Sequence, residues 1–264
     1  MIKIFTFGSN RADFIGLQLR SFQRHLKEDF EFVVFNNATY DNGAGGNYNG
    51  LHEQAKAFGI RMIDVVKDPG LVERCQKIEL SCPLFNHQGL YSNANVAHAY
   101  ALCWAWENHI SKERQPIAIF DSDVFLIEPV SLTEMMLPHV MLNVPDGKTH
   151  QQDGRVFRYM WPTFVVMDMA RLPDPETVNW WCGRVENTPV DVGGQTYHYF
   201  QAHPDLDVIS ARKLHHTEFS TDEFYLTKGD QCATVLHYRS GSNWDHRSRE
   251  FHQQKTEWLK ARIG

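Results

Sequence analysis

Two aspartates one residue apart, Asp121 and Asp123, are the side chains in this sequence best suited to hold a metal ion. They follow the apolar run Ile117–Phe120, which predicts a buried strand of a parallel sheet. Ligands of open α/β sheets bind beyond the carboxyl ends of the strands. Residues i and i+2 of an extended chain point the same way, so both carboxylates can converge on one hard cation, Mn²⁺ or Mg²⁺. The alternative interpretation is a polar turn between two strands, because Asp is common in turns.

Two segments of the chain resemble motifs of a known enzyme class. Phe120–Val124 looks like the Asp-x-Asp element of nucleotide-sugar glycosyltransferases with the A-type fold. Leu236–Trp244 is similar to the His-x-x-Gly-x-x-Lys-Pro-Trp element of the retaining family typified by glycogenin and bacterial galactosyltransferases. Here the spacing from His237 to Gly241 is longer by one residue, and Ser242-Asn243 stands in place of Lys-Pro.

The resemblance implies a fold, a cofactor and a reaction. The fold is α/β, a single-domain Rossmann-like A-type glycosyltransferase fold with a mostly parallel central sheet flanked by helices. His237 would complete the shell of a Mn²⁺ (or Mg²⁺) ion held by Asp121 and Asp123, and Gly241 would approach the diphosphate. The implied reaction moves a hexosyl group from a UDP- or GDP-sugar donor to a hydroxyl of a sugar or glycoconjugate acceptor.

Polar and small residues follow the first two predicted strands, where a nucleotide would bind. By resemblance, the donor and its nucleotide are expected to contact these strand tips, the start of a later helix and the residue between the two aspartates: Thr6, Phe7, Gly8, Asn10, Asn36, Asn95 and Ser122. The alternative interpretation for the asparagines is ordinary turn chemistry, in which the side-chain amide bonds to nearby backbone.

The acceptor side of the site is predicted around Asp191 and Gln195, which lie in an Asp-Val-Gly-Gly-Gln segment before an aromatic helix. This segment resembles the one that shapes the reaction centre in such transferases, so both residues are candidate catalytic residues. The alternative is a helix N-cap with a flexible approach. Upstream, Met160–Pro162 is a candidate lining of the acceptor pocket, because flat aromatic rings suit sugar faces.

The order of predicted elements favours one domain, residues 1–264, with a nucleotide-sugar half at 1–129 and an acceptor half at 130–264. The first half is predicted to hold strands at 2–7, 30–35 and 60–66, helices ending near 26 and 58, an irregular segment at 67–90 and a long helix at 93–110. The second half is predicted to hold strands at 141–144 and 164–169, a loop at 145–155 and a surface helix at 245–264.

The composition limits the function classes. The chain of 264 residues is 42% hydrophobic with a net charge of -6, which argues against a nucleic-acid surface. Met1–Phe7 predicts a strand instead of a signal peptide, and no apolar stretch reaches the roughly 18 residues of a membrane span, so we expect a cytoplasmic enzyme. The five cysteines form no Cys-x-x-Cys pair, which favours free thiols over zinc or disulfides.

Two other function classes fit parts of the pattern. A phosphatase of the haloacid-dehalogenase type also uses an apolar strand followed by Asp-x-Asp, with the first Asp as nucleophile. Its Asp pair follows the first strand of the fold, whereas Asp121 follows at least three predicted strands. A non-catalytic carbohydrate-binding protein is suggested by the seven tryptophans. Such a protein would need no metal and diphosphate constellation, so the transferase hypothesis explains more of the sequence.

Overall fold

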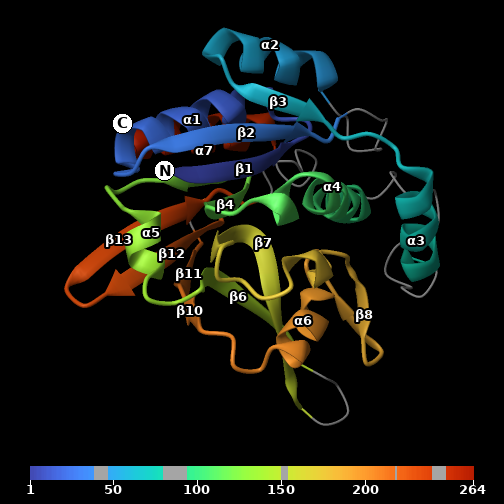
Figure 1. Cartoon of the computed structure of the whole chain (residues 1–264). Helices are drawn as coiled ribbons and strands as arrows, with labels where there is room; N and C mark the ends of the chain where they lie inside the picture. Colours follow the sequence, from blue (N-terminus) through green and yellow to red (C-terminus); the bar gives the residue numbers. More distant parts are fainter. Residues whose placement is uncertain (39–46, 80–93, 150–153, 218, 240–247) are drawn as a thin grey trace.

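The computed structural model describes residues 1–38, 47–79, 94–149, 154–217, 219–239 and 248–264. In this part of the chain the largest sheet has seven strands in the order β10-β6-β7-β4-β1-β2-β3 (Figure 1). Their bounds are β1 Ile2–Gly8, β2 Phe30–Asn36, β3 Arg61–Asp64, β4 Pro116–Asp121, β6 Met141–Thr149, β7 Val156–Asp168 and β10 Val208–Ser210.

Four neighbouring strands of this sheet run parallel: β4, β1, β2 and β3. The register sets Phe7 opposite Asp121 and Gly8 opposite Asn36, so the carboxyl ends of β1, β2 and β4 lie level at one edge. Strand β7 is antiparallel to both β4 and β6, and β10 is parallel to β6. The prediction of an α/β fold with a mostly parallel central sheet is therefore confirmed.

Helices cover both faces of this sheet (Figure 1). They are α1 Ala12–His25, α2 Tyr48–Phe58, α3 Pro69–Glu79, α4 Ala94–Asn108, α5 Leu132–Met136, α6 Thr196–Ala202 and α7 Arg249–Ile263, with 3₁₀ turns at Ile110–Lys112 and Pro175–Thr177. Phe5 and Phe7 of β1 pack in one core with α4, and the alternate residues Ile2 and Ile4 pack in a second core with α1. This two-sided burial is what a continuous apolar strand predicts.

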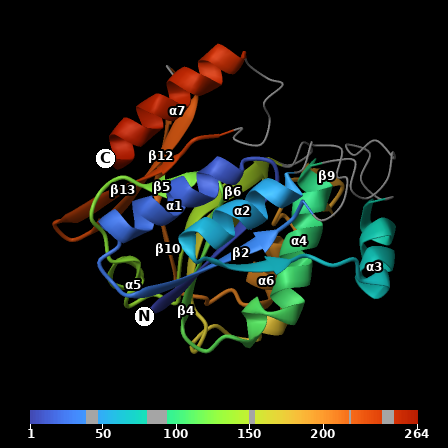
Figure 2. The same ribbon diagram turned by 90° about the horizontal axis from the view of Figure 1, so that it is seen from above.

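A second sheet is antiparallel, with its strands in the order β11-β12-β13-β5. Its strands are β5 Val124–Leu126, β11 Arg212–His216, β12 Thr221–Lys228 and β13 Gln231–His237. One face, through Phe224 and Val235, joins the core on the α1 side of the large sheet. The other face packs on α7 through Leu259 and Ile263, and Figure 2 shows α7 beside β12 and β13.

The structure corrects two predictions of irregular chain. Residues 67–90 were expected to be irregular, but Pro69–Glu79 is helix α3, and 80–90 lie outside the described residues. Pro is tolerated in the first helical turn because its missing N–H has no partner there. The loop predicted at 145–155 is also wrong, since β6 continues to Thr149 and pairs with β7 beyond a register shift after Asn143. The glycines of this segment are typical of a loop. Its backbone N–H and C=O groups are nevertheless satisfied by pairing with the neighbouring strand.

The long predicted helix is confirmed as α4, and its tryptophans belong to the core. Trp104 is 7% and Trp106 1% exposed, and Trp106 Nε1 donates to the carbonyl of Pro175 at 2.7 Å. None of the helices that the structure describes is long and apolar enough to cross a membrane. The four described cysteines are free thiols, as predicted, and Cys82 lies outside the described residues.

Candidate active site

Three of the predicted residues meet where the chain passes from one sheet to the other. Asp121 ends β4, Asp123 precedes β5, and His237 ends β13, where it pairs with Val124. The backbone N–H of Tyr238 donates to the carbonyl of Asp123 at 2.8 Å, which ties the end of β13 to the aspartate turn. One ligand atom from each of the three side chains lies within 4.8 Å of the others. Sheet pairing therefore assembles this cluster from segments far apart in sequence.

Neighbouring side chains hold Asp121 in a fixed orientation. Thr163 Oγ1 donates to its Oδ2 at 2.8 Å, and Gln18 donates to its carbonyl oxygen at 2.8 Å. Its Oδ1 is buried without a hydrogen-bond partner and lies 3.4 Å from His98 Nε2. Burial raises the pKa of Asp121, and the nearby charge of Asp123 raises it further. A cation placed against Oδ1 would relieve both effects.

A buried carboxylate orients His237 from behind. Its Nε2 lies 3.5 Å from Asp123 Oδ1, and its Nδ1 lies 3.5 Å from Asp222 Oδ2. Burial alone would lower the pKa of His237, but the negative charges of Asp123 and Asp222 outweigh burial and raise this pKa to about 9. Burial opposes ionisation of Asp222, yet the nearby His237 imidazole and a hydrogen bond with His215 leave the pKa of this carboxyl below its usual value.

The donor set fits a hard divalent cation. Asp121 and Asp123 offer carboxylate oxygens, the ligands that Mn²⁺ and Mg²⁺ prefer, and His237 offers Nε2. A metal-bound histidine commonly gives its other ring nitrogen to a carboxylate, which is the place that Asp222 occupies. The unbonded, buried Oδ1 of Asp121 is the kind of atom that a metal ion would satisfy.

Asp222 gives a direct test of this orientation. We expect Asp222→Asn to lower the pKa of His237 below about 9, because the protonated imidazole loses one of its two anions. Loss of such a supporting carboxylate should also weaken metal binding by about 10–100-fold. The imidazole titration can be followed by NMR without metal. Asp207→Asn is the matched control, because Asp207 pairs with His139 at 2.6 Å on the surface. Equal His237 titration in wild type and Asp222→Asn would contradict the pairing.

The side chains predicted at the strand tips are engaged within the protein. Thr6 is fully buried, and its Oγ1 donates to the carbonyl of Phe120 at 2.8 Å. Asn36 is also fully buried, and its amide donates to Asp64 Oδ1 at 2.9 Å. Phe7 is 5% exposed, and a Cβ added to Gly8 would meet Leu51 at 2.8 Å. These side chains shape the edge of the sheet, so a ligand there would contact mainly backbone and neighbouring groups.

The remaining predicted donor residues have varied settings. Asn10 is half-buried after β1, Asn95 is exposed in the first turn of α4, and Ser122 is half-buried between the two aspartates. Gly241 lies outside the described residues. On α4, one turn after Asn95, His98 Nε2 lies 3.4 Å from Asp121 Oδ1.

The predicted acceptor turn is fastened to β7. Asp191 Oδ1 accepts a hydrogen bond from the backbone N–H of Val192 at 2.8 Å, and Thr196 Oγ1 accepts one from the N–H of Met160 at 2.8 Å. Gln195 Nε2 donates to the carbonyl of Arg184 at 2.9 Å, so this amide nitrogen supports strand β8 (Gly183–Val185) of the hairpin with β9 (Thr188–Val190). The turn thus packs against the strand that also supplies residues 161 and 163 to the site.

A glycine allows this turn to approach β7. Gly193 has φ +81, and a Cβ there would lie 2.1 Å from the carbonyl oxygen of Met160. We expect Gly193→Ala to lower the free energy of unfolding by about 1–2 kcal/mol for the left-handed backbone and by a further 1–3 kcal/mol or so for the clash. Gly229→Ala is the matched control, since Gly229 has φ +56 and open space around it. Urea denaturation of both variants measures the difference, and equal losses would contradict the close approach.

Two residues that the sequence did not assign, Thr163 and Asp222, complete the surroundings of the cluster. Thr is common in strands and Asp is not, but neither residue type by itself marks a ligand site, and only the register brings them to the predicted ligands. Trp161, a predicted pocket residue, lies edge-on to His237 with ring centroids 5.3 Å apart. This contact places Trp161 beside the cluster of Asp121, Asp123 and His237, and the pocket-lining role of Met160–Pro162 stays a prediction.

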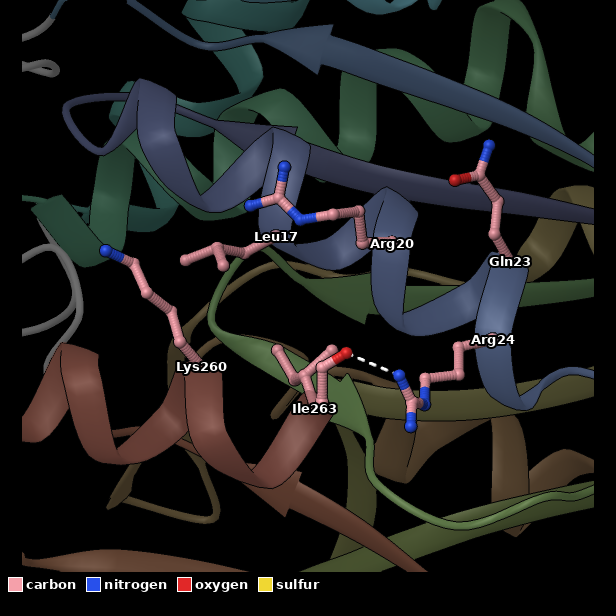
Figure 3. Close-up of a pocket in the computed structure, with 7 residues that line it drawn as sticks. Leu17, Arg20, Gln23, Arg24, Lys260 and Ile263 are labelled. Atoms are coloured by element: carbon pink, nitrogen blue, oxygen red, sulfur yellow. Dashed lines mark hydrogen bonds between the residues drawn. The ribbon is translucent and has the colours of Figure 1, made fainter.

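A separate hollow between α1 and α7 contains none of the predicted site residues. Its volume is about 520 Å³, and its lining includes the cations Arg20, Arg24 and Lys260. Figure 3 shows their side chains around Leu17 and Ile263, with Arg24 donating a hydrogen bond to the carbonyl of Gly264. Lys260 also pairs with Glu257 at 2.7 Å. The cationic side chains of this hollow lie outside the candidate active site, so they are suitable positions for control variants.

No family model matches the chain, and no curated protein matches it by sequence. Among solved structures, an active-site variant of the galactosyltransferase LgtC has 14% identity and a TM-score of 0.49 over 99% of this chain and 95% of that one. Mouse xyloside xylosyltransferase 1 has 13% identity and a TM-score of 0.46 over 80% and 85%. A Pyrobaculum calidifontis mannosyltransferase, in complex with GDP-Man and Mn²⁺, has 13% identity and a TM-score of 0.43 over 79% and 54%. Similarity at this level concerns the course of the backbone. The chemistry of this protein depends on its own residues.

Proposed function

We propose that this protein is a metal-dependent glycosyltransferase. It would move a sugar of the hexosyl type from a UDP- or GDP-sugar to a hydroxyl of a sugar or glycoconjugate acceptor. The observation that carries the proposal is the convergence of Asp121, Asp123 and His237 at the carboxyl edge of parallel strands. This edge is where ligands of open α/β sheets bind.

Each residue of the cluster has a defined task in such a reaction. When bound, Mn²⁺ or Mg²⁺ supplies Lewis-acid stabilisation of the charge that develops on the leaving diphosphate. Asp121, fixed by Thr163, and Asp123 would hold the ion, and His237 would present Nε2 to it. Asp222 keeps the imidazole turned toward the aspartates. The pre-set orientation matters, because transition-state stabilisation requires ligands that need no rearrangement.

The two sides of the cluster suggest how donor and acceptor divide the protein. The tips of β1, β2 and β4 belong to residues 1–129, which we assign to the nucleotide sugar. Trp161 and the Asp191 turn belong to residues 130–264, which we assign to the acceptor. The metal ligands come from both parts, so bound metal would join the two halves of the site.

Ligand-dependent thermal shifts test this proposal. UDP or GDP should raise the melting temperature only with Mn²⁺ or Mg²⁺ present, because the diphosphate binds through the ion. Incubation with a panel of nucleotide sugars and simple glycosides should then yield a glycoside product. Turnover of p-nitrophenyl phosphate without nucleotide binding would favour a phosphatase instead. A shift with free glycans alone would favour a non-catalytic carbohydrate-binding protein.

A further inference from the structure

Two cations, Lys213 and Arg239, and the imidazole of His215 gather around one buried carboxylate on the second sheet. His215 Nδ1 lies 2.9 Å from Asp222 Oδ1, Lys213 Nζ lies 3.6 Å from Oδ2, and Arg239 Nε lies 3.4 Å from Oδ2. The Asp222 side chain is 1% exposed, whereas those of Lys213, His215 and Arg239 are 40–44% exposed. We call these three exposed residues the cationic cluster. Each of these side chains contacts Asp222 and is also accessible to solvent.

The charges in this group do not cancel. Lys213 and Arg239 each carry a full positive charge at neutral pH. Asp222 balances one of them, and the described part of the chain brings no second carboxylate into ion-pair distance of either cation. At least one positive charge is therefore available to a ligand. An anion placed here would form charge-assisted hydrogen bonds, which are about twice as strong as neutral ones.

The backbone at Arg239 is held in a conformation that L-residues avoid. Its φ is +59, in the left-handed region that residues with a side chain rarely adopt. Lys255, itself 2% exposed, donates a hydrogen bond from Nζ to the Arg239 carbonyl at 3.4 Å and stabilises this turn. The guanidinium contacts Asp222 and His215, with Nε 3.4 Å from Asp222 Oδ2 and Nη1 2.9 Å from His215 Nδ1, while 40% of the side chain remains exposed.

An aromatic surface links the cationic cluster to the metal ligands. Lys213 Nζ lies 4.3 Å from the ring centroid of Trp161, and the same ring lies 5.3 Å from that of His237. Trp161 is half-buried, so part of its ring is accessible. An aromatic ring between a reaction centre and a cation can contact the apolar face of a sugar whose charged group reaches the cation.

The cationic cluster lies on the far side of His237 from the aspartates. Nε2 of His237 faces Asp123, whereas Nδ1 faces Asp222. His215, Asp222 and His237 are direct neighbours across β11, β12 and β13, so His215 lies two strand spacings, about 10 Å, from the ligand histidine. A diphosphate held through Asp121 and Asp123 would thus lie on the opposite side.

From this arrangement we propose that Lys213, His215, Arg239 and Trp161 form an acceptor subsite for a sugar that carries a carboxylate or a phosphate. This proposal rests on the proposed transferase function, since only a transferase has an acceptor. We assign the cluster to the acceptor because it lies beside the metal ligands and away from the nucleotide strands. The anionic group would pair with Lys213 and Arg239, and the sugar ring would lie against Trp161. The acceptor hydroxyl would then point toward the metal site.

Binding of small charged sugars to the whole protein tests the subsite without a turnover assay. The probes are methyl glucuronide for the carboxylate, glucose 6-phosphate for the phosphate, and methyl glucoside as the neutral reference. At least one charged probe should bind about tenfold or more tightly than the glucoside, since a hydrogen bond to a charged group is worth at least that factor. The probe that binds more tightly identifies the source of the charge. Equal affinities for all three probes would overturn the proposal.

Single substitutions show which residues bind the charged probe. Lys213→Gln and Arg239→Gln should each weaken the charged probe by about tenfold, whereas Lys213→Arg, which keeps the charge, should retain most of the affinity. Lys260→Gln in the α1–α7 hollow of Figure 3 is the matched control and should change nothing. A loss in Lys260→Gln equal to that in Lys213→Gln would mean non-specific attraction and would overturn the subsite.

Nucleotide binding separates this proposal from the proposed function. Lys213→Gln should leave the binding of UDP or GDP with Mn²⁺ unchanged within about twofold. If Lys213→Gln loses nucleotide affinity and keeps the charged sugar, the cluster serves the diphosphate and the acceptor assignment is wrong. If wild type binds the charged sugar but no nucleotide with metal, the transferase function fails while an acidic-sugar site remains. Melting temperatures within a few degrees of wild type confirm that each variant is folded.

Discussion

Asp123→Asn should abolish metal-dependent nucleotide binding while leaving the protein folded. The amide keeps the shape of the side chain but removes the charge that faces His237 and the neighbouring Asp121. Lewis-acid stabilisation of a diphosphate is worth several kcal/mol, so sugar transfer should fall by at least about 10²-fold. The fold should survive, because position 123 lies in the turn between β4 and β5 and not in either core.

Calorimetric titration of UDP and GDP, with and without Mn²⁺, measures this effect. Asp230→Asn is the matched control, since Asp230 is an exposed residue of the β12–β13 turn. The control should bind nucleotide and metal like wild type. Wild-type affinity in Asp123→Asn would show that the cluster holds no catalytic metal.

Asp191→Asn should reduce sugar transfer by roughly 10²-fold or more if this carboxylate takes the proton of the acceptor hydroxyl. The turn that carries Asp191 packs on β7, the strand of Trp161, in the part of the chain that we propose binds the acceptor. Asp191 Oδ1 already accepts the N–H of Val192, a bond that the amide oxygen of asparagine can keep. The variant therefore tests the charge of the side chain with little change in the turn.

The kinetic pattern separates two roles for Asp191. A general base should show its loss in kcat with donor binding intact, whereas a residue that only orients acceptor hydroxyls should show a raised acceptor KM. Product analysis by NMR adds the stereochemistry. Retention, as in the family that the His237 segment resembles, would let the leaving phosphate accept the proton, and inversion would require a carboxylate base. Full activity of Asp191→Asn would remove this residue from the site in either case.

Local pattern was enough to predict the elements that end at the site. The apolar run before Asp121 predicted β4, and the two aspartates converge as expected, although the chain turns at Ser122 and Asp123 instead of continuing as one extended strand. The helical spacing of apolar residues predicted α1 and α4. Each of these features depends on residues that are close together in the sequence. The pattern of apolar residues and the backbone geometry therefore specify it without the rest of the chain.

The same local signals misled where sequence composition and structure diverge. Pro69-Gly70 suggested a turn, but proline suits a first helical turn and α3 begins there. The glycine and polar residues after Met141 suggested a loop, although their backbone pairs with β7. The first case is local helix chemistry that was read as a turn, whereas in the second case pairing with β7 overrode residue preferences of about 1 kcal/mol or less.

The sequence by itself determined the α/β class, the strand that ends at Asp121 and the three metal-ligand candidates. Only the tertiary structure decided what surrounds them: His98 and Thr163 on Asp121, and Asp222 behind His237. These partners come from separate strands and helices, and strand register decides which of them meet. A shift of one residue in β12 would turn Asp222 to the opposite face, and nothing in the local sequence records that choice.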